Sequence, residues 1–191
     1  AIWVLIIVEL IILCTISTTY RIDINKGTSI QNTPIPLSTL TTTSLQSDNS
    51  NYVYGICLSL KLDPQAPDES PSSTIFTSVL NYSNVPHVSY NSSLKCLRIT
   101  MKQQDGKTRV ICDINVPLQK WFTIYIAYDH GIMDVFYNGK LIKSKGNIIP
   151  YMTSTTMTIG MNDGVKGEIT NVRFFTEVLN HQKIQRLSFL K

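Results

Sequence analysis

Carboxylates and imidazoles that could do chemistry are few in this chain and widely spaced. Glycoside hydrolysis needs two carboxyl groups that flank a cleft, about 5 Å apart for retention or about 6.5–9.5 Å apart for inversion. No two glutamates lie in a paired pattern on one predicted strand, and no serine or cysteine nucleophile signature surrounds a histidine. We therefore predict that the chain is not an enzyme. The residues concerned are Glu9, Glu69, Glu168, Glu177, His87, His130 and His181.

The four cysteines do not have the spacing of a zinc site, because no two of them are arranged as C-x-x-C. Cys14 lies in an apolar segment at the start of the chain, whereas Cys96 and Cys112 flank a predicted hairpin. Two interpretations stay open for the latter pair: the thiols face each other across the hairpin, or both are buried and free.

Two glycosylation sequons occur, at Asn81 and at Asn91. The sequons have a function only if this part of the chain is exposed to glycosylation enzymes. The alternative is chance occurrence in a chain that is rich in Asn and Ser.

The composition is that of a chain with a real core, since 43% of the residues are hydrophobic and 16% are charged. The net charge of +4 is spread along the sequence. There is no run of Lys and Arg with interleaved aromatic residues, so nucleic acid is a poor candidate for the partner.

The chain begins with an apolar segment, residues 1–16, which contains Trp3, Cys14 and a single charged residue, Glu9. A spanning helix needs about 20 residues to cross a hydrocarbon core about 30 Å thick. We predict a transmembrane anchor helix over residues 1–20, in which Glu9 is costly unless it is protonated or paired. A signal peptide and a buried core segment are the alternatives. Against a signal peptide, no basic n-region is visible and no A-x-A-like cleavage site follows the apolar run.

Residues 21–51 are rich in Ser, Thr, Asn and Pro, and we predict a linker that includes the first strands. From residue 52 the apolar residues recur with a period of two, which indicates a half-buried strand over 52–62. Further strand-like runs follow at short spacing, which favours an antiparallel sandwich over a parallel α/β fold. We assign residues 52–191 to this domain, with Tyr52, Tyr54, Ile56, Leu58, Leu60 and Leu62 on one face of its first strand.

Two dipeptides, Asp105-Gly106 and Asn138-Gly139, predict hairpins. A two-residue Asn-Gly loop favours a type I′ turn and fixes the register of its strands. The expected cross-strand pairs are Phe136 with Leu141, Val135 with Ile142, and Asp134 with Lys143.

Large apolar side chains and a capped helix complete the expected fold. Trp121 opens an alternating strand and is expected to be buried in the core, where it and Phe136 supply apolar area. A short helix over residues 181–187 is predicted, with Asn180 as its N-cap and with Leu179 and Ile184 forming a hydrophobic staple. Gly160 and Gly167 are expected to allow a close backbone approach or a bulge.

The region from Trp121 to Leu187 resembles the C-terminal half of laminin-G-like, concanavalin A-like jelly rolls. The pattern combines a Trp that opens a strand with Y-D-x-G, D-V-aromatic-x-N-G-K, hydrophobic-x-I-G and G-x-I-x-N-V-x-aromatic segments. The resemblance implies an all-β, antiparallel two-sheet jelly-roll sandwich, and the motif specifies a fold rather than a reaction. The matching residues are Trp121, Tyr128, Asp129, Gly131, Asp134, Val135, Phe136, Asn138, Gly139, Lys140, Ile159, Gly160, Gly167, Ile169, Asn171, Val172, Phe174, Leu179 and Ile184.

Four segments narrow the resemblance: NVPLQKW, YDHGIMDVFYNG, IIPYM and VPHVSYN. They are similar to segments of membrane-anchored lectin-fold virion proteins of nucleocytoplasmic large DNA viruses, although Val85 stands where that group has Asn. Laminin-G-like relatives often bind calcium through loop oxygens. Asp129, Asn162 and Asp163 lie in predicted loops and are weak calcium candidates, with solvated turn residues as the alternative. No other cofactor is expected.

These resemblances lead to a functional hypothesis. The chain is expected to be a non-enzymatic structural virion protein, either a minor capsid protein or a link between capsid and membrane. It would be a single-pass protein of the viral particle, beneath or within the capsid, and its partners would be membrane lipid, capsid or other virion proteins, and copies of itself. A carbohydrate-binding surface module, with a glycan as partner, is the first alternative. A glycosidase is the second.

Overall fold

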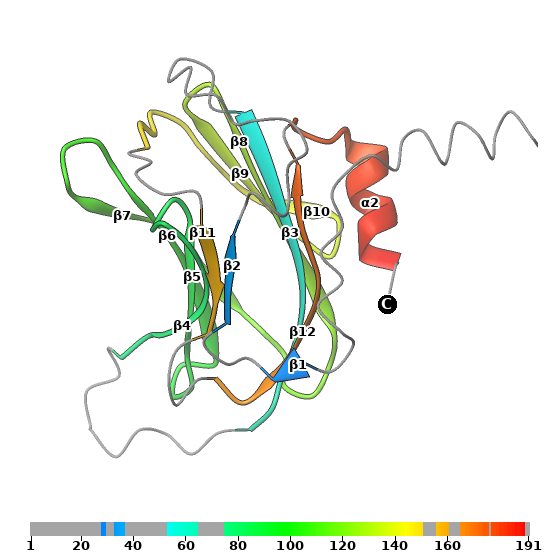
Figure 1. The fold of residues 1–191 in the computed structure, drawn as a ribbon. Coiled ribbons are helices and arrows are strands. Elements are labelled where there is room, and N and C mark those ends of the chain that lie inside the picture. The colour runs from blue at the N-terminus through cyan, green and yellow to red at the C-terminus, as the bar shows by residue number, and fades with distance from the viewer. Residues whose placement is uncertain are drawn as a thin grey trace, which may run out of the picture.

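The computed structural model describes residues 28–29, 33–36, 53–64, 75–150, 156–160, 165–175 and 177–189. In these parts of the chain two antiparallel sheets face each other, and one short helix lies outside the sandwich (Figure 1). This arrangement confirms the expected all-β jelly-roll class. The predicted anchor helix over residues 1–20, with Trp3, Glu9 and Cys14, lies outside the described residues.

The first sheet has six strands, in the spatial order β1-β12-β3-β8-β9-β10. All neighbouring strands in it are antiparallel. Its strands are β1 (Thr28–Ser29), β12 (Gly167–Phe175), β3 (Val53–Leu62), β8 (Phe122–Asp129), β9 (Ile132–Tyr137) and β10 (Lys140–Lys145).

The second sheet also has six antiparallel strands, in the order β2-β11-β4-β5-β6-β7. Both sheets therefore extend into the segment before residue 52, through β1 and β2. The strands of the second sheet are β2 (Thr33–Pro36), β11 (Thr156–Ile159), β4 (Thr77–Tyr82), β5 (His87–Asn91), β6 (Cys96–Lys102) and β7 (Thr108–Asn115).

The main core lies between the two sheets and follows the period-two pattern of the sequence. In β3 the side chains of Tyr54, Ile56 and Leu58 point into this core, together with Leu60 and Leu62. The opposite face of β3 is buried as well, since Cys57 belongs to a second apolar cluster. The strand is therefore buried on both faces, whereas alternation alone predicts one face in water.

The second cluster is covered by the helix α2 (His181–Phe189), which packs on the outer side of β8 (Figure 1). The Asn180 carboxamide oxygen accepts a hydrogen bond of 2.9 Å from the Lys183 backbone, as expected of an N-cap. Leu179 and Ile184 are both buried in the cluster, so the predicted staple and short helix are confirmed.

The Asn138-Gly139 turn joins β9 and β10 with positive φ at both residues, 48° and 77°, as a type I′ loop requires. Phe136 lies opposite Leu141, as predicted. The next two predicted pairs are wrong: a bulge after Leu141 places Lys143 opposite Val135, not opposite Asp134. A bulge inserts an extra residue in one strand, which shifts every later pair by one.

The predicted burial of Trp121 is wrong. Trp121 is half-buried and precedes β8, whose first residue, Phe122, is fully buried in the core. Neighbouring side chains in a strand point to opposite faces. Because Phe122 and Ile124 point into the core, Trp121 points to the opposite side of the sheet.

Gly167 has the close backbone approach that was expected of it. A Cβ atom at this position would lie 2.4 Å from the carbonyl oxygen of Lys61 on β3. Gly160 has a positive φ of 73°, which favours glycine. Among the described residues, no helix is long and apolar enough to cross a membrane.

Candidate functional site

The outward side of the second sheet is polar, and it is the candidate binding surface. The strands β4 to β7 alternate, so that residues such as Val88 and Ile99 fill the core while their neighbours point away from it. Cross-strand pairing then aligns the outward side chains in rows: Ser78 pairs with Ser89, and Ser89 with Arg98. We call this surface the polar face; it comprises His87, Arg98, Thr100 and Asp113, together with Ser78 and Ser89, whose side chains are buried.

Arg98 and Asp113 form the centre of the polar face. Arg98 donates two hydrogen bonds to the carboxylate, Nε to Oδ1 and Nη2 to Oδ2, both of 2.8 Å. The guanidinium also lies over the ring of Phe76, 4.1 Å from the ring centroid. The aromatic ring, the cation and the carboxylate are thus joined in one partly exposed unit.

This ion pair changes the proton affinity of both partners. The hydrogen bonds from Arg98 hold the pKa of the Asp113 carboxyl below its ordinary value of 3.8. The hydrogen bond to Asp113 raises the pKa of Arg98 in turn. Asp113 is therefore a fixed anion at neutral pH, and it would accept hydrogen bonds rather than donate them.

His87, on β5, lies opposite Thr100 of β6. Its Nε2 atom is 3.0 Å from the hydroxyl oxygen of Ser78 on β4. Burial lowers the pKa of His87 from its ordinary value of 6.5. The imidazole is therefore neutral at pH 7, so that it can both donate and accept a hydrogen bond.

The polar face offers recognition chemistry and not an evident reaction. It combines hydroxyls, a neutral imidazole, an ion pair and one aromatic ring, which suit a ligand that carries many hydroxyl groups. Asp113 is held by Arg98, while Glu168 is 3.5 Å from Lys61 on the other sheet. The described residues contain no group of three His, Cys, Asp or Glu side chains that could hold a metal ion.

The weak calcium candidates do not come together in the described parts of the chain. Asp129 is exposed at the end of β8, and its carboxylate contacts Nδ1 of His130. Asn162 and Asp163 lie outside the described residues. The calcium expectation therefore stays untested.

The two cysteines of the β6–β7 hairpin are free thiols in the structure. Cys96 pairs with Asn115 and Cys112 with Ile99, so they do not lie opposite each other. Burial raises the pKa of both, that of Cys112 to about 11. The interpretation with two free thiols is the one that the structure supports.

The two sequons differ in access. Asn91 is buried, and its side-chain nitrogen donates a hydrogen bond of 3.0 Å to the carbonyl of Ile75. Asn81 is half-buried on β4, and its side-chain oxygen accepts a bond from the backbone of Asn84. Glycosylation of Asn91 would require the folded strand to give up that hydrogen bond.

The fold-specifying residues serve the architecture, at a distance from the polar face. Asn138 and Gly139 form a turn of the first sheet, and the Asn138 oxygen accepts a 2.9 Å bond from the Thr123 backbone. Phe136 packs with Tyr125 under α2. None of these fold-specifying residues belongs to the polar face, whereas the VPHVSYN segment contributes His87 and Ser89 to it.

Sequence reasoning missed Phe76, Arg98 and Asp113, and it noted His87 only as isolated. The pairing of Arg98 with Asp113 could not be read from the Asp105-Gly106 turn. A bulge between Ile99 and Thr100 shifts the register between β6 and β7 before that pair is reached.

Comparisons with known proteins agree with this fold. A family model described as the concanavalin A-like lectin/glucanases superfamily matches residues 39–185. No curated protein matches the chain.

Among solved structures, the binding domain of botulinum neurotoxin DC in complex with SialylT aligns with a TM-score of 0.63 and 17% identity, over 83% of this chain and 39% of that one. The binding domain of botulinum neurotoxin serotype G gives a TM-score of 0.62 and 16% identity, over 91% and 47%. The receptor binding domain of botulinum neurotoxin D gives 0.63 and 14%, over 91% and 45%. This chain spans less than half of each of them, and at these identities the likeness concerns the fold alone.

Proposed function

Since the chain belongs to the concanavalin A-like lectin/glucanases superfamily, we propose that it is a non-enzymatic binding module that recognises carbohydrate through its polar face. The observation that carries the proposal is the unit of Phe76, Arg98 and Asp113. It places an aromatic ring beside fixed hydrogen-bond donors and acceptors on an open sheet surface.

A sugar presents hydroxyl groups at its edge and C–H groups on its faces. The carboxylate of Asp113 and the imidazole of His87 can accept hydrogen bonds from sugar hydroxyls, and the Thr100 hydroxyl can both donate and accept them. The Arg98 guanidinium covers one face of the Phe76 ring, and the other face can pack on the apolar face of a sugar. Rigid strands hold these groups, so little conformational entropy is lost on binding.

The similar structures support a binding role. They are binding or receptor-binding domains, one of them in complex with SialylT by its printed description. A non-catalytic role fits the described carboxylates, because Asp113 and Glu168 lie on different sheets and each is close to a cation.

The experiment is a glycan array probed with the labelled full chain and with two variants. Phe76→Ala removes the aromatic platform and is expected to lower affinity about 30-fold, which corresponds to about 2 kcal/mol for a residue central to binding. Trp121→Ala is the matched control, because it removes a half-buried aromatic side chain from the first sheet. Both variants must first show the strand-dominated circular dichroism of the parent chain.

Two outcomes of the array would refute the proposal. One is the absence of any glycan that binds above background. The other is a glycan whose binding is lost in the Trp121 variant and kept in the Phe76 variant.

A second candidate function is that of a membrane-anchored virion component, a minor capsid or capsid–membrane linking protein. It is supported by the resemblance of VPHVSYN and of YDHGIMDVFYNG to such proteins. Its partners would be membrane lipid, capsid or other virion proteins, and copies of itself. Immunogold labelling of purified particles tests it: label on the particle supports this candidate, and particles free of label refute it.

A further inference from the structure

A second surface lies at the open edge of the sandwich, where β7 ends the second sheet and β10 ends the first. These edge strands come together, because the Lys145 Nζ atom donates a 2.6 Å hydrogen bond to the carbonyl of Val110. The segment 146–150 lies along the same edge: Arg109 bonds the Asn147 carbonyl at 2.9 Å, and the Gln104 backbone bonds the Ile149 carbonyl at 3.0 Å. We call β7, β10 and residues 146–150 the open edge.

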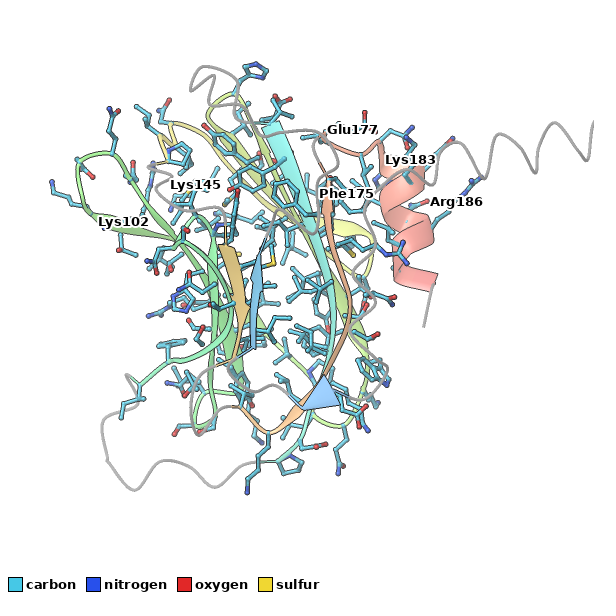
Figure 2. The ribbon with its side chains drawn as sticks, viewed as in Figure 1. Lys102, Lys145, Phe175, Glu177, Lys183 and Arg186 are labelled. Atoms are coloured by element: carbon cyan, nitrogen blue, oxygen red, sulfur yellow. The ribbon has the colours of Figure 1, made fainter. Side chains whose placement is uncertain are left out.

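The open edge is basic. Arg109, Lys143 and Lys145 lie close enough together to affect one another, because desolvation and then the charges of Arg109 and Lys143 lower the pKa of Lys145. Figure 2 shows Lys102, at the end of β6, on the same side of the molecule as Lys145. Two of the nearby carboxylates are already matched, Asp105 with Lys107 at 3.8 Å and Asp113 with Arg98. Asp134 lies on β9, opposite Ser144 of β10, and one of its carboxylate oxygens is buried.

The open edge is also apolar. The described part of the chain exposes seven large apolar side chains, and four of them belong to this edge. Side chains of this size that are exposed in one region mark an interaction surface. The four are Val110 (42% exposed), Leu141 (46%), Ile142 (42%) and Ile149 (59%).

We propose that the open edge docks on the surface of a bilayer that contains anionic lipid, with Ile149 and its apolar neighbours entering the headgroup boundary and the cations meeting lipid phosphates and carboxylates. Interleaved basic and apolar side chains are the pattern of surfaces that lie on anionic membranes. The four apolar side chains are aliphatic, whereas sugars and nucleic-acid bases are usually stacked on aromatic rings.

Self-pairing of the edge does not explain these features. Two copies of β10 joined as antiparallel neighbours would bring lysines close to lysines, and the bulge after Leu141 interrupts the ladder. An anionic bilayer, in contrast, offers a fluid surface that needs no strand register. The polar face shares β7 with the open edge through Asp113, whereas its other residues lie on β4, β5 and β6.

The test uses the full chain and vesicles of brominated phosphatidylcholine, either pure or mixed in equal parts with phosphatidylserine. Ile149→Trp places a fluorophore at the most exposed apolar position of the edge, and bromine quenches it only on contact with the acyl region. Leu94→Trp is the matched control, because Leu94 is 50% exposed in the β5–β6 turn, which lies at the end of β7 opposite to Val110. The fluorescence of the parent chain is subtracted, so a membrane contact elsewhere in the chain does not affect the result.

We expect quenching of the Ile149→Trp chain with phosphatidylserine present, and much less with pure phosphatidylcholine or with Leu94→Trp. Adding Lys143→Gln and Lys145→Gln should lower the ratio of docked to undocked chain about fivefold for each lysine removed. Lys95→Gln with Lys120→Gln removes the same charge outside the group of Arg109, Lys143 and Lys145 and should leave the ratio unchanged.

Three results would overturn the proposal. They are no quenching in anionic vesicles, equal quenching of the Leu94→Trp chain, and quenching that is insensitive to the two edge lysines. An open edge that instead binds an acidic protein would give the first of these results.

Discussion

The hydroxyl oxygen of Tyr125, on β8, accepts a hydrogen bond of 3.0 Å from the backbone nitrogen of Leu179, at the start of α2. The ring of Tyr125 is buried between Phe136 and Phe175 in the cluster under the helix. On the neighbouring strand β3, Tyr125 pairs with Cys57, and Gly55 lies two residues away, where a Cβ atom would lie 2.8 Å from ring carbons of Tyr125. One side chain thus joins the helix to the sheet, and the glycine leaves room for it.

Removing this hydroxyl is expected to weaken the attachment of the helix. Tyr125→Phe leaves the buried Leu179 N–H without its partner, which costs about 1–3 kcal/mol of the free energy of unfolding. Tyr137→Phe is the control, since Tyr137 is half-buried and lies outside this cluster. Urea denaturation of both variants checks the prediction, and equal midpoints would show that the Tyr125–Leu179 bond contributes nothing.

The glycines of the fold are expected to differ in their tolerance of alanine. Gly167→Ala should cost about 2–6 kcal/mol, because the Cβ would meet the Lys61 carbonyl and φ is 153°. Gly106→Ala, with a φ of 79° and free space around it, should cost about 1–2 kcal/mol. Gly146→Ala meets no atom within 4 Å and should change stability by less than about 0.5 kcal/mol. Thermal melts give the order, and a Gly167 variant as stable as the Gly146 variant would contradict it.

Truncation of two adjacent aromatic residues should have very different effects. Phe122 is fully buried in the main core, so Phe122→Ala is expected to cost about 3–5 kcal/mol. Trp121 is half-buried outside that core, and Trp121→Ala should cost about 1 kcal/mol. Differential scanning calorimetry separates the two. A greater loss of stability in the Trp121 variant would mean that Trp121, and not Phe122, points into the main core.

The hairpins, the helix cap and the sandwich class could be predicted from the sequence because each depends on local chemistry. Asn138-Gly139 requires positive φ at both positions, and Asn180 supplies a side-chain oxygen to a free backbone donor. The alternation of β3 predicts its core face correctly.

What could not be predicted depends on pairing over long distances. The bulge after Leu141 moved Lys143 away from Asp134, and α2 covers the second face of β3. The polar face also depends on long-range strand pairing. His87, Arg98 and Asp113 come from three strands, and a bulge in β6–β7 decides which residues meet. The motif residues between Trp121 and Leu187 predicted the fold class but no residue of the candidate site.

The stability of the domain should fall in mild acid because of His87. Burial keeps the pKa of the folded His87 below 6.5, so the unfolded chain takes up a proton that the folded chain resists. The stabilisation is complete above about pH 6.5 and is lost as the pH falls toward the lower folded value. His87→Gln should reduce the loss of melting temperature between pH 7 and pH 5. An unchanged pH dependence in this variant would exclude His87 as the cause.

The central claim, that the polar face recognises carbohydrate, is tested most directly by following backbone amide chemical shifts of the full chain during titration with the strongest ligand from the glycan array. We predict that the largest shifts occur at Phe76, His87, Ser89, Arg98 and Asp113, and that α2 and β8 stay unchanged. The claim is contradicted if saturating glycan shifts the amides of the first sheet or of α2 and leaves those of β5 and β6 in place.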